Sequence, residues 1–239
     1  MGEAQQLTKI GENNIAISRE EMEKANELAS LSKTQLKQAK ARDKLRDKEL
    51  EMANIREKLA IKSRKLAETK RDLDNKGLIK VPDEMIQKEL DDASYGESIA
   101  KLQKEIAKLN ESITEKEVKI AKNNKVLAKE SMQVAKARQV LGKKQLSYVK
   151  LLQGYSDEEK LQKAKAEYTS KEKKFFKEMR DVEDKREDIR KHENKLADFR
   201  KELAEKITEL EKIRHAAISI PDNVEESAIE LPDSNSEAK

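Results

Sequence analysis

A hydrophobic residue returns at every seventh position from 99 to 141 without interruption. An α-helix has 3.6 residues per turn, so a column with seven-residue spacing stays buried only when helices wind around one another. The column therefore predicts a long helix in a left-handed coiled coil. Its members are Ile99, Ile106, Ile113, Ile120, Leu127, Val134 and Leu141.

Two further stretches of the chain carry the same seven-residue spacing. One lies before this column and one after it, so we predict three helices that pack along their apolar columns. The earlier column consists of Leu45, Met52, Leu59, Leu66 and Leu73, and the later one of Leu161, Tyr168, Phe175, Val182, Ile189, Leu196, Leu203, Leu210 and Ala217.

Alanines form a second column, one position behind the apolar column, in the first two stretches. Small side chains let two helix axes approach closely, because the distance between packed helices depends on the side chains at their contact. We therefore expect close packing along one side of these helices. The alanines are Ala53, Ala60 and Ala67, followed by Ala100, Ala107, Ala121, Ala128 and Ala135.

Helix start and stop signals divide the chain at two places. Asn75-Lys76-Gly77 is a helix C-terminal signal, and Pro82 precedes the next helical pattern. Gly154 stands before Ser156-Asp157-Glu158-Glu159, which has the form of a capping box. One continuous helix is the alternative, but these signals favour helices over 18–75, 84–153 and 157–217. The first is expected to begin at Ser18, because Ser18-Arg19-Glu20-Glu21 is also a capping box.

The predicted fold is therefore all-α: a long antiparallel three-helix coiled-coil bundle that we expect to be a homodimer. Residues 18–217 form its elongated helical domain, because short connections make consecutive helices fold back. Residues 1–17 are expected to be a flexible N-terminal segment. Residues 218–239 are expected to be a disordered tail, since their six acidic residues face a single lysine. This tail is either a docking or autoinhibitory arm or a solubilising extension.

The composition supports a coiled coil over a globule or a disordered chain. Charged residues make up 42% of the sequence, too many for a compact core of this size. The charges nearly cancel, to a net charge of +4, and the chain has only 6 Gly and 3 Pro. A disordered chain is usually unbalanced in charge and rich in these two residues.

The sequence offers little for catalysis or metal binding. It has no cysteine, and its two histidines, His192 and His215, stand 23 residues apart on one predicted helix. We therefore expect no enzymatic activity, no cofactor, no metal site and no small-molecule substrate. Since no apolar run approaches the ~20 residues of a membrane span, we expect a cytoplasmic location, with peripheral attachment to a membrane left open.

Positive charge is concentrated in two runs. Residues 116–150 contain ten Lys and Arg but two Glu, a net charge of +8, and residues 33–48 contain seven bases and two Asp, a net charge of +5. If the first two helices fold back, paired residue numbers sum to roughly 160, and the two runs lie side by side as one basic stripe. The candidate anion-binding residues are Lys37, Lys40, Lys44, Lys119, Lys122, Lys125, Lys129, Lys143 and Lys144.

A basic stripe has several candidate partners. It attracts an anionic membrane surface, an acidic protein or nucleic acid, and the lack of aromatic residues near the basic runs disfavours nucleic acid. The stripe could equally be the ordinary solvated face of a coiled coil. In that case the chain would be a protein-interaction rod, such as a filament or tether, without lipid binding.

Residues 143–203 resemble the helical hairpin of BAR domains, particularly those of sorting nexins. The resemblance is carried by Lys143-Lys144-Gln145-Leu146-Ser147-Tyr148-Val149-Lys150-Leu151-Leu152, by the turn Ser156-Asp157-Glu158-Glu159-Lys160-Leu161, by Lys163-Ala164-Lys165-Ala166-Glu167-Tyr168 and by Asp198-Phe199-Arg200-Lys201. It implies an antiparallel three-helix dimer whose basic surface binds curved anionic membranes. A non-enzymatic scaffold on such a membrane is therefore the function that we expect first.

Overall fold

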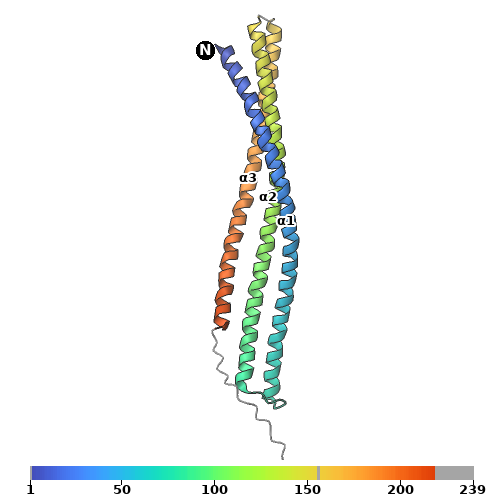
Figure 1. The fold of residues 1–239 in the computed structure, drawn as a ribbon, viewed down its shortest axis with the longest axis vertical. Coiled ribbons are helices and arrows are strands. Elements are labelled where there is room, and N and C mark those ends of the chain that lie inside the picture. Colours follow the sequence, from blue (N-terminus) through green and yellow to red (C-terminus); the bar gives the residue numbers. More distant parts are fainter. Residues whose placement is uncertain (1, 155–156, 219–239) are drawn as a thin grey trace, which may run out of the picture. The chain divides into compact units, whose positions relative to one another are not determined.

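The computed structural model describes residues 2–154 and 157–218, and over these residues the chain consists of three long α-helices with no strand. They are α1 (Glu3–Asn75), α2 (Asp83–Gln153) and α3 (Glu158–Ile218), shown in Figure 1. The predicted fold class, an antiparallel helical bundle, is confirmed. The predicted tail lies outside the described residues, except for Ile218 at the end of α3.

The helices divide between two compact units. The first unit comprises Met1–Asn54 and Lys104–Glu205, and the second comprises Ile55–Gln103 and Lys206–Lys239. In the first unit, parts of all three helices lie side by side (Figure 1). In the second unit, the end of α1 and the start of α2 form an antiparallel hairpin.

Helix α1 begins at Glu3, so the predicted start at Ser18 is wrong, and residues 3–17, expected to belong to a flexible segment, are part of this helix. Ser18 is fully buried, and its hydroxyl donates a hydrogen bond of 2.7 Å to the carbonyl oxygen of Ile15. A serine with a glutamate three residues later can cap a helix, but it can also lie inside one when its hydroxyl bonds to the preceding turn. The burial of Ser18 against the bundle favours the second arrangement.

The turn between α1 and α2 is built by glycine. Gly77 has a φ of +68°, in the left-handed region that glycine adopts without strain. The amide of Leu78 donates to the carbonyl of Leu73 at 3.0 Å, and the amide of Gly77 donates to the carbonyl of Asp74 at 2.8 Å. These two bonds form a Schellman motif, which ends α1 as the sequence predicts.

The other predicted helix boundaries are close to those observed. Helix α2 begins one residue earlier than predicted, at Asp83, and ends at Gln153. Helix α3 begins after Asp157, whose carboxylate oxygen Oδ1 accepts a hydrogen bond of 3.4 Å from the amide of Glu159. Asp157 thus takes the N-cap position. Ser156, the residue predicted to begin the capping box, lies outside the described residues.

The predicted pairing of α1 with α2 is confirmed in both units. In the first unit, Arg42 pairs with Glu117 and Asn14 with Gln145, and in each pair the residue numbers sum to 159. In the second unit, Lys70 pairs with Glu89, again a sum of 159, and Arg64 pairs with Glu97, a sum of 161. The expected sum of about 160 therefore gives the observed register.

Small residues form the buried seam between α1 and α2. On each helix a column of buried Gly, Ala, Ser or Thr recurs at multiples of seven residues, as the predicted alanine columns require. On α1 the column contains Gly11, Ser18, Ala25, Ser32, Ala39, Ala53 and Ala67, and on α2 it contains Ala100, Ala107, Thr114, Ala121, Ala128, Ala135 and Gly142.

The predicted apolar column of α1 is not buried in the single chain. Leu45 and Met52 in the first unit are 64% and 54% exposed, and Leu59 and Leu66 in the second unit are 63% and 61% exposed. One residue along a helix is a rotation of about 100°, so these side chains point to one flank when the small column faces α2. The small residues face α2, and the leucines do not, because small side chains let the two helix axes approach more closely.

The apolar columns of α2 and α3 form the core of the first unit, as predicted. Val134 and Leu141 of α2 pack with Phe175 and Val182 of α3, and all four are buried. This core places α3 on the side of α2 that carries the residues one position before each member of the small column. The residues one position after each member lie on the other side of α2 and are polar.

Candidate anion-binding surface

All nine lysines of the predicted stripe lie in the first unit. Eight of them are exposed, and Lys144 is half-buried. Their exposure is consistent with a charged surface, and their positions around each helix determine which of them share a flank.

One flank of the α1–α2 pair collects lysines from both helices. Lys40 follows the buried Ala39 by one residue, and Lys122 follows the buried Ala121 by one residue. In an antiparallel pair, residues that stand one position after the two facing columns lie on the same flank. The observed register also places Lys40 at the level of position 119 on α2, since 159 − 40 = 119. The predicted proximity of the two basic runs therefore holds for this flank.

A regular column of lysines runs along this flank of α2. Each of its members follows a buried residue of the seam or the core, and all are exposed. The rise between successive members is about 10.5 Å, seven residues at 1.5 Å each. We call this set the lysine column: Lys122, Lys129, Lys136, Lys143 and Lys150.

Sequence reasoning missed two members of this column, Lys136 and Lys150. It selected lysines by their density along the chain, whereas the structure groups them by position in the seven-residue repeat. The signal was present in the sequence, since each lysine of the column follows the predicted apolar and alanine columns in step. No member of the column has an ion pair within the described part of the chain.

Other predicted lysines point elsewhere. Lys37 stands two residues before Ala39 and Lys44 five residues after it, so both lie about 140–160° from the seam, on the outer side of α1. Lys119 is likewise two residues before Ala121, on the outer side of α2. Lys125, four residues after Ala121, lies about 40° from the seam direction on the flank of the lysine column.

Lys144 holds α3 to α2. Its ammonium group lies 2.7 Å from the Glu167 carboxylate, and the side chains are 41% and 45% exposed. This hydrogen bond, together with the positive charge of Lys144, lowers the pKa of Glu167. Lys144 is therefore already balanced by an acid, and we remove it from the candidate surface.

Helix α3 contributes lysines of its own. Lys136 of the lysine column lines a shallow groove between α2 and α3 together with Lys171 and Lys174, and the groove has a volume of about 370 Å³. Glu178 is the one acidic residue among its lining residues. Beside Lys136, the lysine column is therefore joined by two lysines of α3.

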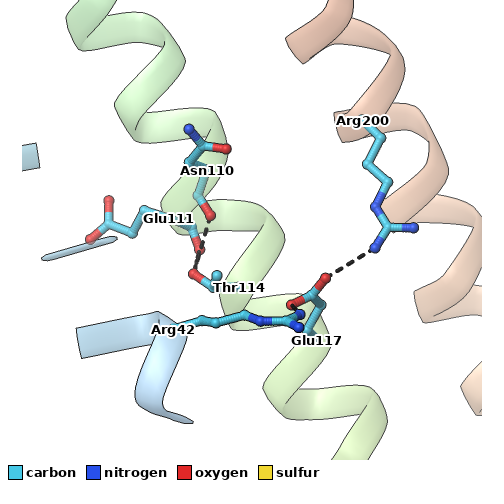
Figure 2. Close-up of polar contacts among 6 residues, drawn as sticks. All are labelled: Arg42, Asn110, Glu111, Thr114, Glu117 and Arg200. Atoms are coloured by element: carbon cyan, nitrogen blue, oxygen red, sulfur yellow. Dashed lines mark hydrogen bonds and ion pairs between the residues drawn. The ribbon is translucent and has the colours of Figure 1, made fainter. Parts of the chain in front are cut away.

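An ion-pair node joins the three helices of the first unit (Figure 2). The Glu117 carboxylate on α2 receives Arg42 of α1 at 3.3 Å and Arg200 of α3 at 3.0 Å. Next to it, the buried hydroxyl of Thr114 donates to the carbonyl oxygens of Asn110 and Glu111 at 3.1 and 2.9 Å. One carboxylate of α2 thus ties α1 and α3 together at this level of the bundle.

A second node lies deeper in the first unit. Arg138 of α2 stands 4.7 Å above the centre of the Phe175 ring, a cation–π distance. Its Nε atom is 3.0 Å from Oε2 of Glu21 on α1, but the two groups are not aligned for a hydrogen bond. Arg138 is only 17% exposed, so it secures the packing of the three helices and is not available to an outside anion.

The described residues contain no group of three or more His, Asp or Glu placed to hold a metal ion. Over the same residues, none of the helices is long and apolar enough to traverse a bilayer. No protein-family model matches the chain, and no curated protein matches its sequence. What the chain binds must therefore be inferred from its surfaces.

Proposed function

We propose that the chain is a non-enzymatic helical scaffold that docks on an anionic membrane through the lysine column. The observation that carries the proposal is the regular, exposed and unpaired series of lysines along α2. A flat array of fixed anions such as lipid headgroups can meet all five lysines at once. The resemblance of residues 143–203 to the BAR hairpin supports the same partner and a preference for curved membranes.

The expected affinity is modest and depends on salt. Each basic residue near an anionic membrane contributes on the order of 1 kcal/mol, so the lysine column supplies about 5 kcal/mol. This attraction falls off within a Debye length of about 8 Å at physiological ionic strength. Such binding is reversible and peripheral, which agrees with the expected location in the cytoplasm or at a membrane surface.

Sedimentation with vesicles tests the proposal. Vesicles of phosphatidylcholine, with and without phosphatidylserine, are mixed with the full chain at low and high salt. A variant with all five residues of the lysine column changed to Glu should lose binding to the anionic vesicles. The matched control changes five exposed lysines on α3 to Glu: Lys165, Lys173, Lys177, Lys195 and Lys201.

The two variants have the same net charge, so their comparison separates a located surface from a general charge effect. The control variant should keep more than half of the wild-type binding. Equal loss in both variants would reject the lysine column as the docking surface. Absence of phosphatidylserine-dependent binding by the wild type would reject the membrane as partner.

An acidic protein or nucleic acid is the alternative partner for the same lysines. Nucleic acid requires a linear fall of log affinity with log salt, with a slope set by the number of phosphates neutralised. The lysine column carries no aromatic residue on which bases could stack, which favours the membrane. Titration with duplex DNA under the salt conditions of the vesicle assay compares the two partners directly.

A further inference from the structure

A groove with an apolar floor lies open between α1 and α2 in the second unit. Its volume is about 520 Å³, and no described residue of α3 lines it. Leu59 and Leu66 of α1 lie on one side, and Ile99 of α2 lies on the other. At the groove, a Cβ added to Gly96 would meet nothing within 4 Å. The groove therefore leaves three large apolar residues beside water.

The same groove positions are covered by a helix in the first unit. There the groove is lined on α1 by Gln35, Gln38, Ala39 and Arg42, and on α2 by Glu117, Ile120, Ala121 and Asn124. Counting 21 residues onward along α1 and 21 residues back along α2 gives Arg56, Leu59, Ala60 and Ser63, and Gly96, Ile99, Ala100 and Gln103, all of which line the groove of the second unit.

In the first unit, α3 completes the lining with Glu193, Leu196, Ala197 and Arg200. In the second unit, leucine replaces glutamine at the position of Gln38, so the uncovered groove is the more apolar of the two. A helix with apolar residues at coiled-coil spacing would therefore fit this groove, in the place that α3 takes in the first unit.

The two sides of the groove carry opposite charges. Arg56 stands on the α1 side and Asp92 on the α2 side, and neither has an ion pair within the described part of the chain. Over residues 55–75, α1 has seven bases and four acids, whereas over residues 83–103, α2 has two bases and six acids. A second copy that is turned end over end would bring the basic side of one groove to the acidic side of the other.

The spacing of the residues fits such a pair. If Leu59 of one copy lies beside Leu66 of the other, paired positions on the two α1 helices sum to 125, and the twofold axis passes between residues 62 and 63. Arg56 then lies at the level of position 69 on the second α1, since 125 − 56 = 69. The register of the second unit, 159–161, places that level at positions 90–92 of α2, which include Asp92.

We propose that the chain forms an antiparallel homodimer through this groove, with Leu59 and Leu66 of each copy covering the groove of the other. The dimer uses the second unit, whereas the lysine column belongs to the first, so this proposal does not depend on membrane binding. It gives the homodimer expected from the sequence a defined interface, and it covers leucines that the single chain leaves exposed.

Sedimentation velocity of the full chain, over a range of concentrations, tests the dimer. Leu66→Glu should raise the dimer Kd about tenfold or more, because it places a charge in the apolar floor. Leu45→Glu is the matched control, since Leu45 belongs to the same column but lies in the first unit. Arg56→Glu should also weaken the dimer, and Arg56→Glu combined with Asp92→Arg should restore it.

Cysteine cross-linking tests the antiparallel register, and the chain has no native cysteine to interfere. Chains with Leu59→Cys are mixed with chains with Leu66→Cys under mild oxidation. The mixture should form a disulfide-linked dimer, and neither variant should do so alone, because identical positions lie about 10.5 Å apart along an antiparallel pair. Linking of each variant to itself would establish a parallel pair and overturn the proposed register.

Two other outcomes overturn the proposal, and both use the Leu66→Cys chain. A monomeric mass at all concentrations, with the introduced thiol open to maleimide, would leave the groove uncovered. A monomeric mass with the same thiol protected from maleimide would assign the groove to another segment of the same chain. The variants change exposed residues, and unchanged circular dichroism verifies that each remains folded.

Discussion

At the scale of the residue, two glycines set how closely α1 and α2 approach. A Cβ added to Gly142 would lie 2.6 Å from the carbonyl oxygen of Gly11 and 3.0 Å from Cγ1 of Ile15. The first of these atoms belongs to the backbone, so it cannot move aside as a flexible side chain would. The two helices therefore cross here at a distance that only glycine permits.

Gly142→Ala should lower the free energy of unfolding by about 1–3 kcal/mol, despite the better helix propensity of alanine. Gly96→Ala is the control, because its added Cβ meets nothing within 4 Å and the same gain in propensity, up to about 1 kcal/mol, should stabilise α2. Urea unfolding at low protein concentration measures both. A stabilising Gly142→Ala would show that the crossing is looser than described.

At the scale of the element, the small residues of the seam are buried and the leucines beside them are exposed, which is the reverse of a usual helical core. Ala128 is 2% exposed in the seam, whereas Leu45 is 64% exposed. Ala128→Leu should destabilise the chain by about 1–3 kcal/mol through overpacking. Leu45→Ala should change stability by no more than about 0.5 kcal/mol. Thermal unfolding of the two variants compares them, and a larger effect of Leu45→Ala would place that leucine in a buried contact.

The hairpin of the second unit should weaken in acid through Glu97. Its carboxylate lies 2.6 Å from Lys101 and 3.0 Å from Arg64, and the side chain is 12% exposed. Hydrogen bonds from Lys101 first and Arg64 second lower the pKa of Glu97. Because the folded-state pKa lies below the unfolded value of about 4.3, this stabilisation is complete above that pH and is lost as the pH falls through the folded pKa.

Glu97→Gln provides the comparison, because it removes the titrating group and keeps the shape. Hydrogen exchange of the α2 amides around residue 97 should accelerate below about pH 4 in the wild type. After correction for intrinsic exchange rates, the variant should show a smaller dependence on pH. Identical profiles in the two proteins would mean that these ion pairs do not stabilise the hairpin.

At the scale of the whole molecule, periodicity predicted the three helices and the register of α1 and α2. The seven-residue columns and the signals at Gly77 and Gly154 were sufficient, because helix pairing follows repeating side-chain size. Sequence reasoning erred where one pattern has two meanings. Ser18 fits a capping box and also a buried seam, and only the packing partner distinguishes them.

The basic surface was predicted in part. The density of lysines located it on α2, but the contribution of Lys171 and Lys174 required the arrangement of α2 and α3. The ion pair of Lys144 with Glu167 likewise joins residues 23 positions apart. No local sequence pattern predicts such a pair, because the pair depends on which faces of α2 and α3 pack against each other.

Because the small residues of the seam repeat every seven positions, they restrict how the lengths of α1 and α2 can change. In the second unit, Ala60 and Ala67 on α1 and Ala93 and Ala100 on α2 stand seven residues apart. A loss or gain of seven residues in both helices at matched levels would return small side chains to facing positions. Insertions of other sizes would rotate one helix against the other. Natural variation in length should therefore come in paired multiples of seven.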